Sequence, residues 1–311
     1  MDLRIVFMGT PDFAVPSLKI LLDNGYNVVG VVTATDKFGG RGNKKLLESP
    51  VKKFAVAQGL KVLQPEKLRE EVFLEELRNL KANLQIVVAF RMLPEIVWGM
   101  PALGTFNLHG SLLPRYRGAA PIHWAVIRGE KETGCTTFFI QHKIDTGDML
   151  FQAKLSIGEN ETTGEVHDRM MHLGAELVLK TVRAIESGAY ELQLQDDSQA
   201  TKAPKLFHET CEINFEQPLD QVHNFIRGLS PWPAAWTELD GLQLKITSST
   251  KEVADHNYRP GTLLTDNKKM LKIAVPGGYI HVHELQLQGK KRMDAGAFLN
   301  GNELESGKWL G

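Results

Sequence analysis

The chain lacks most of the features that mark secreted, membrane-spanning or metal-binding proteins. It has two cysteines in 311 residues, Cys135 and Cys211, and they form no CxxC pair. This scarcity excludes a disulfide framework and predicts a reduced protein of the cytoplasm. No apolar run approaches the roughly 20 residues that span a bilayer. The segment after Met1 is too short for a signal peptide, so neither secretion nor a membrane partner is expected.

An excess of positive or negative charge is also missing, and so are several sequence motifs of cofactor and metal sites. The formal net charge is −1, so a polyanion would need a local basic patch. The first apolar run ends in MGTPDF, with Gly9 alone where a dinucleotide turn has three glycines, which argues against a nicotinamide cofactor. HExxH is absent and no third ligand accompanies His281 and His283, so no metal is expected.

What the sequence does contain, in its first two thirds, is a regular alternation of strand and helix patterns. Short apolar runs typical of buried strands occupy residues 3–8, 26–35, 60–65, 84–90, 104–110 and 135–141. Helical patterns occupy residues 11–25, 49–59, 69–81, 119–130 and 163–188. This alternation predicts an α/β fold with a doubly wound, mostly parallel sheet.

The pattern changes after Tyr190. Residues 190–205 are polar and irregular, which is typical of a linker. Beyond them, one helical segment at 219–229 precedes several short strands with glycine turns, which favours a small β-barrel or sandwich. We therefore predict a catalytic domain at 1–189, a linker at 190–205 and a second domain at 206–311.

The candidate site is in the stretch FNLHGSLLPRYRGA and the turn that follows the next apolar run. Side chains alternate along a strand, so Asn107 and His109 face the same way. An amide can donate to a carbonyl oxygen and an imidazole can exchange a proton, while Asp145 in QHKIDTGDML could hold that imidazole charged. The spacing alone leaves two interpretations open, because a strand-end histidine and a DTGD turn are often purely structural.

A second candidate feature is the basic, glycine-rich loop from Asp36 to Lys53. Its cations are Lys37, Arg41, Lys44, Lys45, Lys52 and Lys53, set against Asp36 and Glu48. A flexible basic loop suits contact with a phosphate backbone. A solvated charged surface loop is the structural alternative.

These stretches resemble the methionyl-tRNA formyltransferases, a family of folate-dependent enzymes. The resemblance is carried by RIVFMGTPDFAVPSL, FNLHGSLLPRYRGAAPIHWAVIRGE, TTFFIQHKIDTGDML, the GGRGNKK loop, INFEQPLDQVHNFIRGLSPWPAAWTEL and LQLQGKKRM. It implies a Rossmann-like catalytic domain followed by an OB-like β-barrel. The implied activity is transfer of the formyl group of 10-formyltetrahydrofolate to the α-amino group of methionyl initiator tRNA. No metal is implied, and a monomer is expected.

The resemblance also implies site residues by position. Asn107, His109 and Asp145 match the family's catalytic trio. The tetrahydrofolate-binding residues it implies are Ser111, Leu112, Leu113 and Pro114, with Phe90, Arg91 and Met92 around the pterin. The tRNA-binding residues it implies are Arg41, Lys44 and Lys45.

Other functions remain as alternatives. A sugar-nucleotide formyltransferase or a formyltetrahydrofolate hydrolase would share the same core, but neither substrate needs the basic 36–53 loop. A non-catalytic tRNA-binding or folate-binding module is the alternative of a different class. The complete set of Asn107, His109 and Asp145 argues against it.

Overall fold

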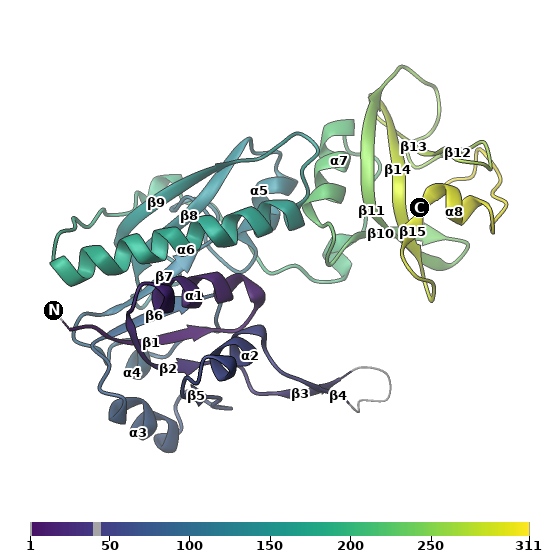
Figure 1. The fold of residues 1–311 in the computed structure, drawn as a ribbon. Coiled ribbons are helices and arrows are strands. Elements are labelled where there is room, and N and C mark those ends of the chain that lie inside the picture. Colours follow the sequence, from purple (N-terminus) through teal and green to yellow (C-terminus); the bar gives the residue numbers. More distant parts are fainter. Residues whose placement is uncertain (1, 40–44, 311) are drawn as a thin grey trace. The chain divides into compact units, whose positions relative to one another are not determined.

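The computed structural model describes residues 2–39 and 45–310, and its chain forms two compact units (Figure 1). The first unit comprises residues 1–118, 134–155 and 167–202. The second comprises residues 119–133, 156–166 and 203–311. Two stretches from within the predicted catalytic domain thus pack with the carboxyl-terminal part of the chain. No helix in the described residues is long and apolar enough to cross a membrane.

The first unit is built on a seven-stranded sheet in the order β5-β2-β1-β6-β7-β8-β9. Its strands are β1 (Arg4–Gly9), β2 (Asn27–Val32), β5 (Val62–Leu63), β6 (Leu84–Val88), β7 (Thr105–His109), β8 (Glu132–Phe139) and β9 (Met149–Ser156). The pairs from β5 through to β7 are parallel, and β8 runs antiparallel to β7. The predicted mostly parallel, doubly wound sheet is confirmed.

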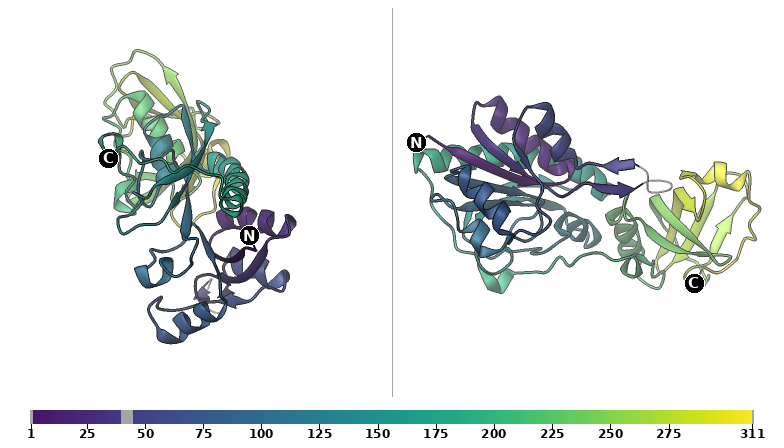
Figure 2. Two further views of the ribbon diagram at one scale, coloured as in Figure 1. Left: turned by 90° about the vertical axis from the view of Figure 1, so that its left-hand side faces the viewer. Right: turned by 90° about the horizontal axis from the view of Figure 1, so that it is seen from below.

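Helices cover both faces of this sheet (Figure 2). They are α1 (Val15–Asp23), α2 (Pro50–Ala57), α3 (Glu71–Asn79), α4 (Glu95–Trp98) and the long α6 (Thr163–Ser187), with the short 3-10 turn η1 (Asp12–Ala14) before α1. Val6 and Met8 pack in one core with Phe73 and Leu77 of α3. On the other face, α6 lies against β8, where the hydroxyls of Thr137 and Thr181 are 2.8 Å apart.

Local sequence explains how α2 starts. Ser49 has an extended backbone and its hydroxyl accepts a hydrogen bond from the backbone N–H of Lys52 at 3.0 Å. Pro50 occupies the first helical position, where its missing N–H costs nothing. The helix predicted at residues 49–59 is confirmed.

The predicted 36–53 loop contains a small hairpin. β3 (Lys37–Gly39) pairs antiparallel with β4 (Lys45–Leu47) as a separate two-stranded sheet. At its base, Lys52 forms ion pairs with Asp36 and Glu48. The prediction of an irregular loop is therefore wrong for the described part of this segment.

The second unit combines helices with a curled antiparallel sheet. Its helices are α5 (Pro121–Ile127), α7 (Leu219–Gly228) and α8 (Ala295–Leu299), and the 3-10 turn η4 (Glu209–Cys211) precedes α7. The 3-10 turn η3 (Asp197–Gln199) belongs to the first unit. Its strands are β10 (Ala235–Leu239), β11 (Leu242–Val253), β12 (Leu263–Thr265), β13 (Leu271–Val275), β14 (Gly278–Leu287) and β15 (Met293–Asp294). They follow the order β10-β11-β14-β13-β12, and β15 pairs with β14. The predicted β domain is confirmed, and its OB-like closure stays a prediction.

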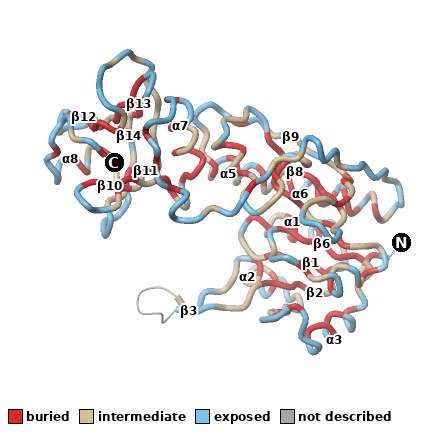
Figure 3. Tube along the Cα trace, turned by 180° about the vertical axis from the view of Figure 1, so that it is seen from behind, coloured by how far each residue is buried: buried red, intermediate tan, exposed pale blue. Residues whose placement is uncertain are grey.

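Each unit has its own buried interior, visible as separate red stretches in Figure 3. In the second unit, Val222 and Ile226 of α7 pack on Ile246, Ile273 and other buried residues of the sheet. Because each unit buries an apolar core, each has its own source of hydrophobic stabilisation.

Candidate active site

His109 is the last residue of β7, and its ring is fixed by the loop that follows. The side chain is buried, and Nε2 lies 2.9 Å from the backbone carbonyl oxygen of Tyr116. A carbonyl can only accept, so Nε2 carries a hydrogen and Nδ1 is the nitrogen left to exchange a proton. Tyr116 reaches this position with φ of 60°, in the left-handed region.

Asp145 faces that exchangeable nitrogen. Its Oδ2 lies 3.8 Å from Nδ1 of His109 and accepts a hydrogen bond from the backbone N–H of Gly118 at 2.8 Å. The first distance is beyond direct hydrogen-bond range, so a proton passing between the two groups needs a bridging group such as water. The predicted pairing of the imidazole with this carboxylate is thus present in the geometry.

Asp145 does not reach His109 from a strand that ends at the same sheet edge as β7. β8 is antiparallel to β7, and Phe139 at its end pairs with Phe106 near the start of β7. The chain therefore leaves β8 away from His109 and runs back to it through residues 140–148. Asp145 sits in this return with φ of 53°, a conformation that aspartate tolerates better than most residues.

Asn107 lies on the same strand face as His109, as alternation predicts. Leu108, between them, faces α6, because a Cβ added at Gly174 of that helix would lie 2.7 Å from the Leu108 side chain. Asn107 is half-buried and pairs across the ladder with Phe138, while His109 pairs with Thr136. The amide and the imidazole therefore share the sheet face opposite α6.

The predicted folate loop, Ser111 to Pro114, is held by a buried hydroxyl. Thr136 Oγ1 donates to the Ser111 carbonyl at 2.7 Å and accepts from the Leu113 N–H at 3.1 Å. Gln152 also donates to this hydroxyl at 3.0 Å and to the Leu113 carbonyl at 2.8 Å. The Leu113–Pro114 peptide bond is cis. Sequence patterns gave no sign of Thr136 or Gln152, since each acts from a different strand.

The segment from Phe90 to Met92 follows β6, the parallel neighbour of β7. It therefore leaves the sheet at the same edge as the 110–114 loop. The guanidinium of Arg91 is held by the carbonyls of Pro65 and Glu66, at 2.5 and 2.7 Å, and its carbon lies 5.8 Å from the Phe90 ring centre. Met92 is largely exposed. A role of these three side chains around a pterin stays a prediction.

Of the predicted tRNA-binding residues, Lys45 is exposed on β4, whereas Arg41 and Lys44 lie outside the described residues. Lys37 is exposed on the facing strand. Lys52 is instead engaged by two carboxylates, so its charge is locally neutralised.

In the described part of the chain, neither a reactive cysteine nor a metal-binding cluster offers an alternative catalytic site. Cys135 is buried in β8, and burial raises the pKa of its thiol to about 12, which makes it a poor nucleophile. Across residues 2–39 and 45–310, no cluster of three histidine, cysteine or acidic side chains could hold a metal ion.

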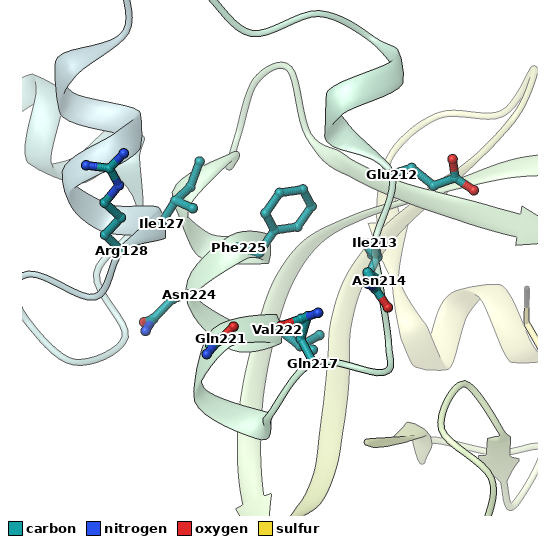
Figure 4. A pocket seen from close by; sticks show the side chains of 10 residues that line it. All are labelled: Ile127, Arg128, Glu212, Ile213, Asn214, Gln217, Gln221, Val222, Asn224 and Phe225. Carbon is teal, nitrogen blue, oxygen red and sulfur yellow. The ribbon is translucent and has the colours of Figure 1, made fainter. Parts of the chain in front are cut away.

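A cavity of about 460 Å³ lies within the second unit (Figure 4). The residues that line it are Ile127, Arg128, Glu212, Ile213, Asn214, Gln217, Gln221, Val222, Asn224 and Phe225. They come from the end of α5, from α7 and from the segment before α7. None of the predicted site residues that the structure describes lines this cavity.

Comparisons with known proteins match both parts of the chain. The family model described as formyl transferase matches residues 3–182, and the model described as formyl transferase, C-terminal domain, matches residues 205–303. A methionyl-tRNA formyltransferase of Parabacteroides distasonis is 54% identical over 310 residues, covering 96% of each chain. One of Phocaeicola vulgatus is 56% identical over 310 residues, again covering 96% of each chain. The resemblance seen in the motifs therefore extends over nearly the whole sequence.

Among solved structures, the chain is similar to WlaRD, a sugar 3N-formyl transferase determined in the presence of dTDP and 5-N-formyl-THF. The two share 20% sequence identity and a TM-score of 0.68, with 94% of this chain and 100% of that chain covered. At this identity the likeness shows the fold alone.

Proposed function

Because this chain belongs to the formyl transferase family, we propose that it transfers the formyl group of 10-formyltetrahydrofolate to the α-amino group of methionyl initiator tRNA. The main structural support for this activity is the short distance between the Asp145 carboxylate and Nδ1 of His109. Asn107 lies on the same face of the sheet as His109. The relatives named methionyl-tRNA formyltransferases, which share more than half of their residues with this chain, support the tRNA acceptor.

The proposed reaction needs donors for an oxyanion and a path for one proton. The amine nitrogen attacks the formyl carbon, and the carbonyl oxygen gains negative charge. The Asn107 amide and the protonated Nδ1 of His109 donate hydrogen bonds to that oxygen. The Asp145 carboxylate stabilises the imidazolium and takes the amine proton through water. The bond from the formyl carbon to the folate nitrogen then breaks, and that nitrogen receives a proton from His109.

The loop from Ser111 to Pro114 would hold the folate, and the β3–β4 hairpin would contact tRNA. The anchoring of the loop by Thr136 supports the first role, because a fixed loop loses little entropy on binding. Exposed Lys37 and Lys45 on the hairpin support the second. We infer further that the protein works as a monomer in the cytoplasm, where its two free cysteines stay reduced.

The alternatives predict other acceptors. A formyltetrahydrofolate hydrolase would transfer the group to water, and a sugar-nucleotide formyltransferase would transfer it to a sugar amine. The test is to supply labelled formyl donor to the protein with charged initiator tRNA, free methionine, an aminosugar nucleotide or water as acceptor. We expect the charged tRNA to react at least 100-fold faster than the others, and a preference for water or the sugar would refute the proposal.

The trio is tested by Asp145→Asn. We expect kcat to fall roughly 10²–10³-fold, the loss typical of removing one electrostatic partner of a transition state, with folate binding retained. Stopped-flow formyl transfer would give kcat, and folate fluorescence titration would give affinity. Full turnover in this variant would contradict the assignment of Asp145.

A further inference from the structure

Residues 193–202 lie against the loops that carry the proposed site, although the sequence predicts them to be part of a linker. We call this segment the strap. At its start, Gln193 and Met149 exchange two backbone hydrogen bonds, of 2.8 and 2.9 Å. Near its end, Thr201 Oγ1 accepts from the backbone N–H of Tyr116 at 2.8 Å. The strap therefore contacts both the start of β9, directly after the loop of Asp145, and the loop whose carbonyl holds His109.

Gln195 connects the strap to the turn around Asp145. Its amide nitrogen donates to the backbone carbonyl of Asp145 at 3.0 Å and to that of Gly147 at 2.8 Å. On another side of this turn, a Cβ added at Gly147 would lie 1.7 Å from the carbonyl oxygen of Phe139. The turn is thus confined between the end of β8 and the amide of Gln195.

Arg117 fixes which end of that amide faces the turn. Its Nε and Nη2 donate to Oε1 of Gln195 at 3.0 and 2.7 Å, and Nη2 also donates to Asp197 at 2.7 Å. With the oxygen held by the guanidinium, both amide hydrogens point to the turn. Arg117 also lies in sequence between Tyr116, which accepts from His109, and Gly118, which donates to Asp145.

We propose that Gln195 is a positioning residue for formyl transfer, which sets the place of the Asp145 carboxylate opposite His109. The inference rests on the function proposed above for that pair. Asp145 has φ of 53°, a conformation less favoured than the right-handed or extended ones, so hydrogen bonds to its backbone help to hold it there. Because catalysis depends on the placement of charge, a carboxylate displaced by about 1 Å would lower turnover by up to about 10²-fold.

The kinetic test compares variants that separate the loss of the Gln195 hydrogen-bond donor from the loss of its side-chain packing. Gln195→Ala is expected to lower kcat roughly 10- to 100-fold and to leave KM for folate and for tRNA within about twofold. Gln195→Glu keeps the shape and the acceptor for Arg117 but cannot donate to the turn, so we expect the same loss. Gln199→Ala is the matched control, since this exposed strap glutamine bonds to Asp196 and its variant should keep wild-type kcat.

A double-mutant cycle tests whether the effect passes through Asp145. Adding Gln195→Ala to Asp145→Asn should change kcat less than twofold beyond the single Asp145→Asn variant, because residues that act as one unit are not additive. A further loss of tenfold or more would mean that Gln195 acts by another route and would overturn the inference.

An independent test uses NMR spectra of the protein without substrates, labelled with ¹⁵N-glycine. The Gly118 amide donates to Asp145, so its resonance should move in Gln195→Ala and in Asp145→Asn but not in Gln199→Ala. An unmoved Gly118 resonance in Gln195→Ala, with or without a fall in kcat, would overturn the positioning role. A moved resonance in a protein that transfers no formyl group to methionyl-tRNA would refute the proposed function and leave the geometric role of Gln195 standing.

Discussion

The backbone carbonyl of Tyr116 decides which nitrogen of His109 can take part in proton transfer. Since Nε2 donates to that carbonyl, protonation and deprotonation occur at Nδ1, opposite Asp145. The hydrogen bond also holds the ring plane of this buried side chain. A backbone carbonyl, which has no ionisable group, therefore sets the orientation of the proposed acid and base.

The hydroxyl of Thr136 is a second small group with a large structural role, and Thr136→Val tests it. Valine keeps the shape of the side chain but leaves the Ser111 carbonyl and the Leu113 N–H without this partner. We expect the free energy of unfolding to fall by about 1–3 kcal/mol. We also expect KM for the formyl donor to rise about tenfold, equivalent to about 1.4 kcal/mol of lost binding.

Urea unfolding and steady-state kinetics would measure the two effects, and the neighbouring residue is the control. Thr137 is equally buried, but its hydroxyl bonds to Thr181 of α6 on the other sheet face. Thr137→Val should cost stability and leave KM for the folate unchanged. Equal KM effects in the two variants would show that Thr136 acts through general stability and does not order the loop.

Among individual residues, the sequence pattern predicted some members of the candidate site and missed others for a physical reason. Asn107 and His109 were predictable because two-residue alternation places them on one face, and Asp145 because a polar turn follows an apolar strand. Gln195 was not predictable, because its contact joins side chain and backbone across 50 residues. The polar, irregular composition around it is typical of linkers, and composition does not report such contacts.

Among the elements, the β3–β4 hairpin shows why very short strands cannot be predicted from a sequence pattern. Each strand has three residues, too few to show alternation, and the five residues between them in the sequence, GRGNK, include two glycines and no apolar side chain. Its base is fixed from outside the hairpin, where Asp36 pairs with Lys52 and accepts a hydrogen bond from Gln64. The hydrogen bond from Lys52, and then the one from Gln64, lower the pKa of the Asp36 carboxyl. β9 was also missed, although apolar and polar residues alternate along its FQAKLS stretch.

The hairpin is the element whose charge we expect to matter for tRNA. Lys45→Ala should raise KM for methionyl-tRNA about three- to tenfold and leave KM for the formyl donor unchanged. The slope of log KM against log salt concentration should fall by about 0.7–0.9, the value for one lost phosphate contact. Formylation kinetics at several salt concentrations would measure both.

Lys19→Ala is a suitable comparison for this variant. Lys19 is an exposed cation on α1 that pairs with Asp23 on the same helix, away from the hairpin in sequence. The two variants change net charge equally. If they had the same effect on KM and on the salt slope, overall charge would explain it and the hairpin would have no particular role.

For the molecule as a whole, the two units should respond differently to acid. His223 on α7 is buried in the second unit, with Nε2 3.1 Å from Asn160 Oδ1. Burial, and then the charges of Arg227 and Lys251, lower the pKa of this imidazole to about 4. Asp220 acts in the opposite direction with a smaller effect.

A folded-state pKa below the unfolded value of about 6.5 favours the neutral ring in the folded protein. Its contribution to stability is therefore complete above pH 6.5 and is lost as the pH falls from about 6.5 to about 4. We expect a loss of about 2–3 kcal/mol for the second unit over this range. His283, whose pKa burial also lowers, adds a loss of the same sign.

Urea unfolding followed by tryptophan fluorescence at pH 7.5 and at pH 4 would measure this loss. The signal reports mainly on the second unit, which holds Trp124, Trp232, Trp236 and Trp309 of the five tryptophans. His223→Gln should be less stable than the wild type at pH 7.5 but should lose less on acidification. An unchanged pH dependence in that variant would show that other groups cause the acid sensitivity.

The interleaved division of the chain has a consequence for recombination with relatives. Each unit is assembled from three separate stretches, so the backbone passes from one unit to the other five times along the sequence. A chimera with a single crossover near the middle would take interior-facing residues of one unit from two different parents. Exchange of a whole unit instead requires all three of its stretches, 119–133 and 156–166 together with 203–311, to be transplanted at once.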